Sequence, residues 1–200
     1  GSFVMGKVML ETPVWQDQWQ KFVVDAGGTI VPKSSRKIEV KLVPEVQGAK
    51  LNQEEAYRLV VSSKGVLVEA TTEKGVYWAL QTLRQLEQKG ARKSSFKACE
   101  IVDWPAFKIR GFMQDVGRSY LSVDELKKEI EMLSRYKINV FHWHLTENQA
   151  WRLESKIFPM LNDSVNMTRI HGKYYTIEEA KELVAFCKKH NMLLIPEIDM

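Results

Sequence analysis

The chain has 200 residues, of which 44% are hydrophobic and 27% charged. This composition is typical of a globular protein with a real core, and it excludes a disordered chain or a coiled coil. No apolar run approaches the roughly 20 residues that a membrane span needs, and the net charge of +4 is small and spread along the chain. We therefore expect no membrane span and no nucleic-acid partner.

The two cysteines, Cys99 and Cys187, have neither metal-binding nor redox spacing, and the sequence leaves open whether they form a disulfide. The N-terminus carries no basic-then-apolar signal peptide. Gly1-Ser2 resembles residues left by cloning, which is compatible with a signal peptide removed by design.

The first half of the chain is predicted to contain short strands. Runs typical of strands and separated by turn residues occur at Lys21–Asp25, Lys37–Leu42, Tyr57–Ser62 and Gly65–Ala70. In the last two runs alternate residues are apolar, which indicates a sheet with one covered face.

A helix is predicted from Thr72 to Lys89, with Gly90 as its stop. Apolar residues recur there at three-residue steps, namely Tyr77, Leu80, Leu83 and Leu86. A sheet covered by one or two helices is an α+β domain. This half has no His, and its carboxylates are scattered among Lys and Arg, so we expect no catalytic group in it.

From Trp104 the pattern alternates between strands and helices. Strands are predicted at Phe112–Val116, Ile138–Leu145 and Leu193–Ile198. Strands that alternate with amphipathic helices are parallel and joined by right-handed crossovers. Three strands and two helices are part of a (β/α)₈ barrel or half of a doubly wound sheet, and the absence of a Gly-rich phosphate loop disfavours a dinucleotide fold. The chain ends directly after a strand, which we interpret as truncation.

Each predicted helix of this half opens with a capping box, in which a hydroxyl residue precedes a Glu by three positions. The first box is Ser122 to Glu125, and the second is Thr176 to Glu179. The residues expected on the buried faces are Leu126, Ile130 and Leu133 in the first helix, and Ala180, Leu183, Val184 and Cys187 in the second.

Polar side chains gather where the three strands of this half end. They are Asp115, Gly117 and Arg118 after the first strand, His142, His144, Glu147, Asn148, Gln149, Trp151 and Arg152 at the second, and Glu197 and Asp199 at the third. In parallel α/β folds the chemistry lies at the carboxyl ends of strands, and the long connection after the second strand is typical of a functional loop.

This set suits a polyhydroxylated ligand, because carboxylates and Arg bind hydroxyl groups and a Trp ring stacks on a sugar face. The alternative is that Asp115–Arg118 and Glu154–Arg152 are ordinary ion pairs that tie loops together. His142 and His144 point the same way along a strand, so they either share a metal ion or are two buried, hydrogen-bonded imidazoles. We favour the buried pair, because the further ligands of a metal site are missing.

Three stretches of this half strongly resemble glycoside hydrolase family 20, the β-N-acetylhexosaminidases: Lys108–Val116, Asn139–Arg152 and Ile195–Met200. Tyr57–Gln88 is similar to the small α+β domain that precedes the barrel in that family. The resemblance implies an N-terminal α+β domain at residues 1–104, and at residues 105–200 the first part of a (β/α)₈ TIM barrel, truncated after its third strand.

The resemblance implies a retaining exo-hydrolase that removes terminal β-linked N-acetylglucosamine or N-acetylgalactosamine without metal or cofactor. Such enzymes are substrate-assisted exceptions to the two-carboxylate scheme. The acetamido oxygen of the substrate attacks the anomeric carbon, an Asp orients that amide, and the adjacent Glu protonates the leaving oxygen. This Asp-Glu pair is expected beyond Met200, so we expect the 200 residues to have no turnover by themselves.

The resemblance also assigns supporting roles to residues within the chain. Arg110 would bind the hydroxyls on the far side of the sugar, Glu147 would support the acid through a His, and Asp115 and His144 would line the pocket floor. The full set expected to bind substrate or support catalysis is Arg110, Asp115, His144, Glu147, Trp151 and Glu197.

The sequence departs from the family pattern at three places. Glu147-Asn148 stands where the family has Asp-Asp, Ala106 where it has Arg, and Ser119 where His is frequent. The alternatives are a non-catalytic carbohydrate-binding module of the same ancestry and a metal-dependent barrel hydrolase. The expected partner is a terminal N-acetylhexosamine of a glycan, in a protein exported from the cell. An open part-barrel is expected to self-associate through its bare edge and apolar face.

Overall fold

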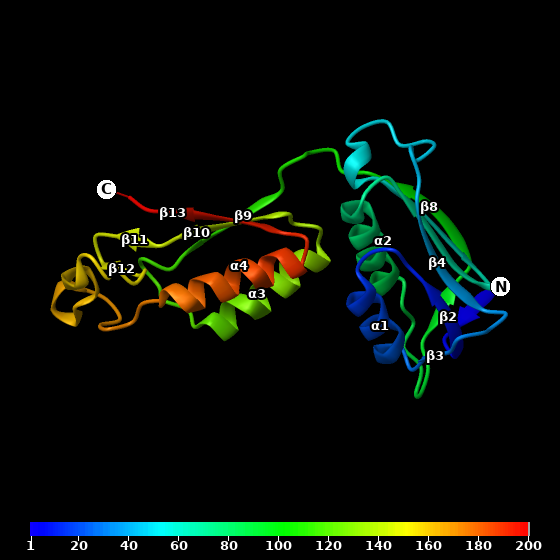
Figure 1. Ribbon diagram of the computed structural model, residues 1–200, viewed down its shortest axis with the longest axis horizontal. Coiled ribbons are helices and arrows are strands. Elements are labelled where there is room, and N and C mark those ends of the chain that lie inside the picture. The colour runs from blue at the N-terminus through cyan, green and yellow to red at the C-terminus, as the bar shows by residue number, and fades with distance from the viewer. Residues whose placement is uncertain (200) are drawn as a thin grey trace. The chain divides into compact units, whose positions relative to one another are not determined.

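The computed structural model describes residues 1–199. The chain divides into two compact units, Gly1–Lys108 and a second that begins at Ile109 (Figure 1). In the described part of the chain, no helix has the length and apolar character needed to cross a bilayer.

The first unit is built on a mixed six-stranded sheet. In spatial order its strands are β3 (Thr29–Ile30), β2 (Lys7–Glu11), β4 (Lys37–Leu42), β6 (Gly65–Ala70), β5 (Tyr57–Ser62) and β8 (Cys99–Asp103). β3, β2, β4 and β6 pair in parallel, whereas β5 is antiparallel to both β6 and β8. A short ribbon of β1 (Ser2–Val4) and β7 (Ser95–Lys97), and the 3₁₀ turn η1 (Gln53–Glu55), complete the strands and turns of this unit.

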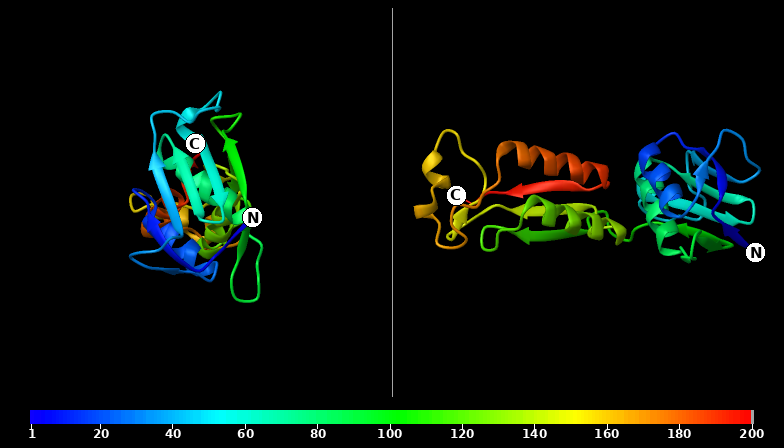
Figure 2. Two further views of the ribbon diagram at one scale, coloured as in Figure 1. Left: turned by 90° about the vertical axis from the view of Figure 1, so that its right-hand side faces the viewer. Right: turned by 90° about the horizontal axis from the view of Figure 1, so that it is seen from below.

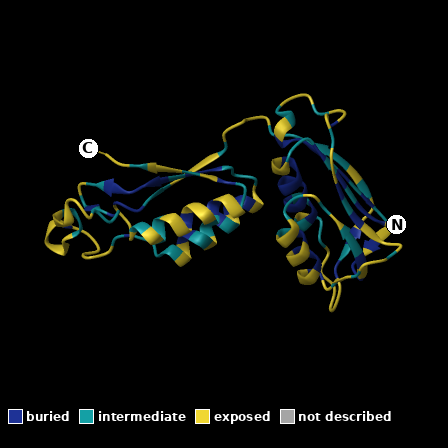
Figure 3. Ribbon diagram, viewed as in Figure 1, coloured by how far each residue is buried: buried dark blue, intermediate teal, exposed yellow. Residues whose placement is uncertain are grey.

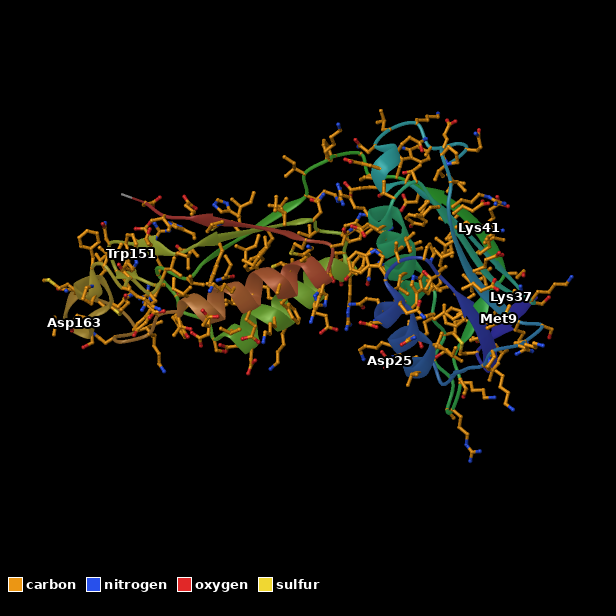
Figure 4. All side chains as sticks on the ribbon, viewed as in Figure 1. Met9, Asp25, Lys37, Lys41, Trp151 and Asp163 are labelled. Carbon is orange, nitrogen blue, oxygen red and sulfur yellow. The ribbon has the colours of Figure 1, made fainter. Side chains whose placement is uncertain are left out.

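Helices α1 (Gln16–Asp25) and α2 (Glu73–Gln85) cover one face of this sheet (Figures 1 and 2). Trp19, Trp78 and Leu80 of the helices are fully buried in the core between the layers. The other face is charged, with Lys37 and Lys41 of β4 directed away from the helices (Figure 4). The sheet with one covered face is therefore confirmed, and the predicted bounds of β4, β5 and β6 agree with the structure.

Two predictions for this unit are wrong. Lys21–Asp25, predicted as a strand, is the second half of α1, because Phe22 and Val23 lie three and four residues after Trp19 and share its buried face. The helix α2 ends at Gln85 rather than at Lys89. The chain then turns away, since Gln88 exchanges two backbone hydrogen bonds of 2.9 Å with Ser95.

The second unit contains three parallel strands in the spatial order β13 (Leu193–Glu197), β10 (Val140–His144), β9 (Gly111–Asp115). Helices α3 (Val123–Arg135) and α4 (Ile177–Lys189) lie together on one face of these strands (Figures 1 and 2). The alternation of strands and helices is therefore as predicted. The central strand β10 is the most buried of the three, because a strand flanks each of its edges (Figure 3).

Both capping boxes are present. The hydroxyl of Ser122 accepts a hydrogen bond from the backbone of Glu125 at α3, and Thr176 and Glu179 do the same at α4. The buried face of α4 differs from the prediction at Val184, which is 51% exposed, whereas Leu183 is fully buried. Successive helical residues do not face the same way, so only one of the two can face the core.

The face of the three strands away from the helices carries both polar and apolar side chains. Residues in register on parallel strands point to the same side, so Met113, His142 and Ile195 share this face. Met113 is 50% exposed and Ile195 43%. Between β10 and α4 the chain forms β11 (Thr146–Glu147), β12 (Ala150–Trp151) and the 3₁₀ turns η2 (Pro159–Asn162) and η3 (Ser164–Asn166).

Candidate functional site

Three predicted site residues form one row at the carboxyl ends of the strands. Asp115 closes β9, His144 closes β10 and Glu197 closes β13, and the strand register places them side by side. All three therefore project from the same face of the sheet, at the end where parallel α/β folds carry their chemistry.

His144 lies at the centre of this row, with its side chain only 7% exposed. Its Nε2 is 3.1 Å from Oδ2 of Asp199. Its Nδ1 is 3.9 Å from a carboxylate oxygen of Asp115 and 3.9 Å from one of Glu197. Both ring nitrogens therefore face carboxylate oxygens, and the contact of Nε2 with Asp199 has hydrogen-bond length.

Arg118 connects two of the carboxylates. Its Nη1 is 2.8 Å from Oδ2 of Asp115, and its Nη2 pairs with Oε1 of Glu147. The backbone N–H of Arg118 also donates to Asp115 Oδ1 at 3.0 Å. The Asp115–Arg118 ion pair, which was the alternative to a ligand site, is therefore present, and it is part of a three-membered cluster that includes Glu147.

The loop at Gly117 must lie close to Glu147 for this cluster to form. A Cβ at Gly117 would lie 2.9 Å from Cβ of Glu147 and 3.2 Å from its backbone nitrogen. Such distances are shorter than ordinary van der Waals contacts, so the glycine is required by the close approach.

The Glu154–Arg152 ion pair, the other part of that alternative, is not formed between these two described residues. Glu154 instead accepts a hydrogen bond of 2.8 Å from the backbone of Ile177 at the start of α4. Arg152 is fully buried, and within residues 1–199 its hydrogen bonds go to main-chain carbonyls and one methionine sulfur. The sequence pattern placed Arg152 among the charged site residues, because it does not distinguish a buried arginine from one that pairs with a carboxylate.

The interpretation of His142 and His144 as two buried imidazoles holds for only one of them. His144 is buried, but the His142 side chain is 40% exposed, and its Nε2 lies 2.7 Å from Oε2 of Glu197. The same Glu197 oxygen lies 3.9 Å from Nδ1 of His144. Among residues 1–199, the group of three whose potential ligand atoms lie within 4.8 Å of one another is His144, Glu147 and Asp199.

Thr146 is a member of this site that sequence reasoning missed. Its Oγ1 accepts a hydrogen bond of 2.7 Å from the backbone N–H of Asp199, which fixes the segment after β13 against the segment after β10. A threonine directly after a buried strand carries no distinct signal, since threonine is common in strands.

The remaining two predicted residues lie outside the cluster. Arg110 precedes β9, about 16 Å along the strand from Asp115 at some 3.3 Å per residue, and its Nε donates to the carbonyl of Lys137 at 2.7 Å. Trp151 lies in β12, opposite Thr146 in a two-stranded hairpin (Figure 4). Its side chain is partly buried, and its indole nitrogen has no hydrogen-bond partner among the residues described.

These side chains have the hydrogen-bonding groups needed to bind hydroxyl groups. Asp115, Glu147, Glu197 and Asp199 supply acceptors for hydroxyl groups, and Arg118 and the two imidazoles supply donors. Carboxylates outnumber the permanent positive charges, so the site favours neutral polyols or cations over anionic ligands.

Comparison with known proteins assigns the two units of the chain to a family. Residues 14–104 match the profile of glycosyl hydrolase family 20, domain 2, and residues 107–200 match that of the glycosyl hydrolase family 20 catalytic domain. The chain therefore consists of two domains of one family, and it belongs to glycosyl hydrolase family 20.

Curated relatives agree with this assignment. A beta-hexosaminidase of Porphyromonas gingivalis is 39% identical over an alignment that covers 74% of this chain and 21% of that protein. A beta-hexosaminidase of Akkermansia muciniphila is 32% identical, with 87% of this chain and 41% of that protein covered. The chain thus spans less than half the length of these relatives.

Solved structures show the same architecture. A beta-N-acetylhexosaminidase from Bacteroides fragilis has a TM-score of 0.82 and 29% identity, with all of this chain and 42% of that chain covered. An exo beta-N-acetylglucosaminidase from Vibrio harveyi, solved with N-acetylglucosamine, has a TM-score of 0.81 and 27% identity, with all of this chain and 34% of that chain covered. An N-terminal domain followed by part of a barrel is therefore the fold of this chain.

Proposed function

We propose that this chain is part of an exo-β-N-acetylhexosaminidase, which removes terminal β-linked N-acetylglucosamine or N-acetylgalactosamine. The observation that carries the proposal is the cluster of Asp115, His144, Glu147 and Asp199 at the carboxyl ends of β9, β10 and β13, within a family 20 catalytic domain. The names of the relatives, and the N-acetylglucosamine bound to the Vibrio harveyi enzyme, support the same substrate class.

The finer architecture belongs to this proposal. We take β9, β10 and β13 with α3 and α4 as the first three strands and two helices of a (β/α)₈ barrel, and residues 1–104 as the preceding α+β domain. The strand order β9, β10, β13 follows the chain order, as neighbouring strands of such a barrel do.

In the proposed reaction the described residues bind and orient the sugar. Asp115 and Glu197 accept hydrogen bonds from sugar hydroxyls, and Trp151 offers an aromatic face. Glu147, held by Arg118, supports the proton-donating group through an imidazole. The Asp-Glu pair that orients the acetamido group and protonates the leaving oxygen lies beyond Met200 in this proposal, so catalysis needs residues that these 200 do not include.

The test is release of nitrophenol from an aryl β-N-acetylglucosaminide by the 200-residue chain and by the full-length protein that contains it. We expect hydrolysis by the full-length protein alone. Activity of the 200-residue chain would refute the placement of the catalytic pair. No hydrolysis by either protein would refute the enzymatic proposal and favour a carbohydrate-binding module.

The role of Glu147 is tested in the full-length protein. Glu147→Gln removes the carboxylate that pairs with Arg118 and should lower kcat/KM by about 100-fold, the scale of one lost acid–base contribution. Glu178→Gln is the matched control, because the Glu178 side chain is 82% exposed on α4. Equal kcat/KM for the two variants would exclude Glu147 from the machinery.

We also infer that the 200-residue chain self-associates through the face that carries Met113, Leu193 and Ile195, which are 50%, 61% and 43% exposed. Met113 and Ile195 flank His142 on one face of the strands, and exposed apolar surface favours association. Sedimentation should show oligomers that Leu193→Glu dissociates, and a monomer at all concentrations would contradict the inference.

A further inference from the structure

Arg152 has a hydrogen-bonding environment unlike that of any other charged group in the candidate site. Its side chain is fully buried, and each of its five N–H groups has a main-chain carbonyl within reach. The acceptors are the carbonyls of Val116 at 3.1 Å, Gly117 at 3.3 Å, Arg169 at 2.8 Å, Ile170 at 2.9 Å and Lys173 at 2.7 Å. An arginine has five N–H donors, so the guanidinium is saturated.

Charge compensation at this site comes from dipoles rather than from a carboxylate. Within residues 1–199 no Asp or Glu forms an ion pair with Arg152. Burial lowers the pKa of the guanidinium, although an arginine remains charged in proteins. A buried charge is tolerated only where polar groups surround it, so the five carbonyls and the guanidinium depend on one another.

The carbonyls come from two segments far apart in sequence. Val116 and Gly117 belong to the loop after β9, whereas Arg169, Ile170 and Lys173 belong to the segment that precedes α4. Ile170 has a φ of 48°, a left-handed conformation that β-branched residues rarely adopt. Such a backbone persists only where its surroundings hold it, and the bond from Arg152 to its carbonyl is one of those restraints.

The first of these segments carries the candidate site. Val116 and Gly117 lie between Asp115 and Arg118 in the chain. Arg118 forms ion pairs with both Asp115 and Glu147. Their N–H groups donate to the carbonyl of His144 at 3.0 and 3.3 Å, while their carbonyls accept from Arg152. The two peptide units are therefore held from both sides.

We infer that Arg152 is a positioning residue of the proposed hydrolase: through the carbonyls of Val116 and Gly117 it fixes the loop that places Asp115, Arg118 and Glu147. It contacts none of these side chains. The inference rests on the proposed function, because its readout on turnover requires that the full-length protein hydrolyses the sugar. The effect on loop order does not require turnover.

The experiment uses Arg152→Ala, Arg152→Lys and the control Arg135→Ala in the full-length protein. Arg135 is a surface arginine at the end of α3, with its side chain 57% exposed. Hydrogen–deuterium exchange should accelerate at residues 116–117 and 169–173 in Arg152→Ala and remain at the wild-type rate in Arg135→Ala. Unchanged exchange in the Ala variant would overturn the inference whether or not the protein is a hydrolase.

Turnover supplies the second readout. Arg152→Ala should lower kcat/KM by about 100-fold, the cost of displacing catalytic groups by about 1 Å. Millimolar guanidinium should restore part of this loss, because the vacated site keeps its five carbonyls, and should leave wild type and Arg135→Ala unchanged.

Arg152→Lys keeps the charge but has only three N–H groups, so it should lie between wild type and the Ala variant, and it serves if the Ala variant does not fold. Wild-type kcat/KM in either folded variant would overturn the inference, as would an Ala variant that guanidinium does not rescue. No hydrolysis by the wild type would refute the proposed function alone.

Discussion

Gly117 allows two loops of the candidate site to approach each other closely. It stands between the Asp115–Arg118 pair and the backbone of Glu147, and no other residue fits the space without moving Glu147. The charged residues around it were visible in the sequence as a cluster at strand ends. The sequence placed Gly117 in the strand-end set but did not indicate that its lack of a side chain permits their contact.

Replacing Gly117 by Ala should lower the free energy of unfolding by about 1–3 kcal/mol, the usual cost of overpacking. The added Cβ would lie 2.9 Å from Cβ of Glu147. Gly111→Ala is the matched control in β9, because its nearest neighbour, Val140 Cβ, would lie at 3.8 Å. Urea unfolding of both variants checks the prediction, and equal stabilities would contradict it.

At the scale of elements, the helices α3 and α4 follow from local signals. A capping box satisfies two backbone donors at a helix start, and apolar residues at helical spacing define the buried face. These signals located both helix starts. They did not separate the buried and exposed members of the apolar set, because Leu183 and Val184 are both apolar and only packing against β10 and β13 selects one of them.

The difference between these neighbours is measurable. Leu183→Ala should reduce the free energy of unfolding by about 2–5 kcal/mol, because Leu183 is fully buried in the core of the second unit. Val184→Ala should change it by less than about 1 kcal/mol, because that side chain is 51% exposed. Thermal or urea unfolding distinguishes the two, and a larger loss in the Val184 variant would refute the assigned face of α4.

At the scale of the whole molecule, burial couples stability to pH through Cys187. Cys99 and Cys187 are both free thiols, so the open question of a disulfide is answered in favour of two separate cysteines. Burial raises the pKa of the Cys187 thiol from 9.0 to about 12. Above pH 9 the unfolded chain therefore loses this proton while the folded chain keeps it.

The contribution of Cys187 to the free energy of unfolding should thus be fully present below about pH 9. It should decrease as the pH rises toward 12, by up to about 1.4 kcal/mol per pH unit. Cys187→Ala should remove that part of the slope, and Cys99→Ala should retain it. Urea unfolding over this pH range is the measurement. An identical slope in wild type and Cys187→Ala would show that Cys187 does not contribute.

Much of the fold could be predicted because its signals are local. The bounds of β4, β5 and β6, the starts of α3 and α4 and the parallel strands of the second unit all agree with the sequence pattern. The strands β1, β2, β3, β7 and β8 were not predicted, since strands of two to five residues carry few alternating positions. Lys21–Asp25 was predicted as a strand and is helical, because a short apolar run fits a strand or a helix until its packing partner is known.

The candidate site was predicted as a set of residues and not as a network. Strand ends in a parallel sheet must meet at one edge, so the sequence by itself determined that Asp115, His144 and Glu197 are neighbours. Only the tertiary structure decided that Arg118 joins Asp115 to Glu147, that Thr146 holds Asp199, and that Arg152 binds carbonyls up to 36 residues away. Periodicity and capping depend on residues three or four positions apart, whereas a main-chain carbonyl is the same in every residue, so which ones a buried arginine reaches is fixed only when the chain has folded.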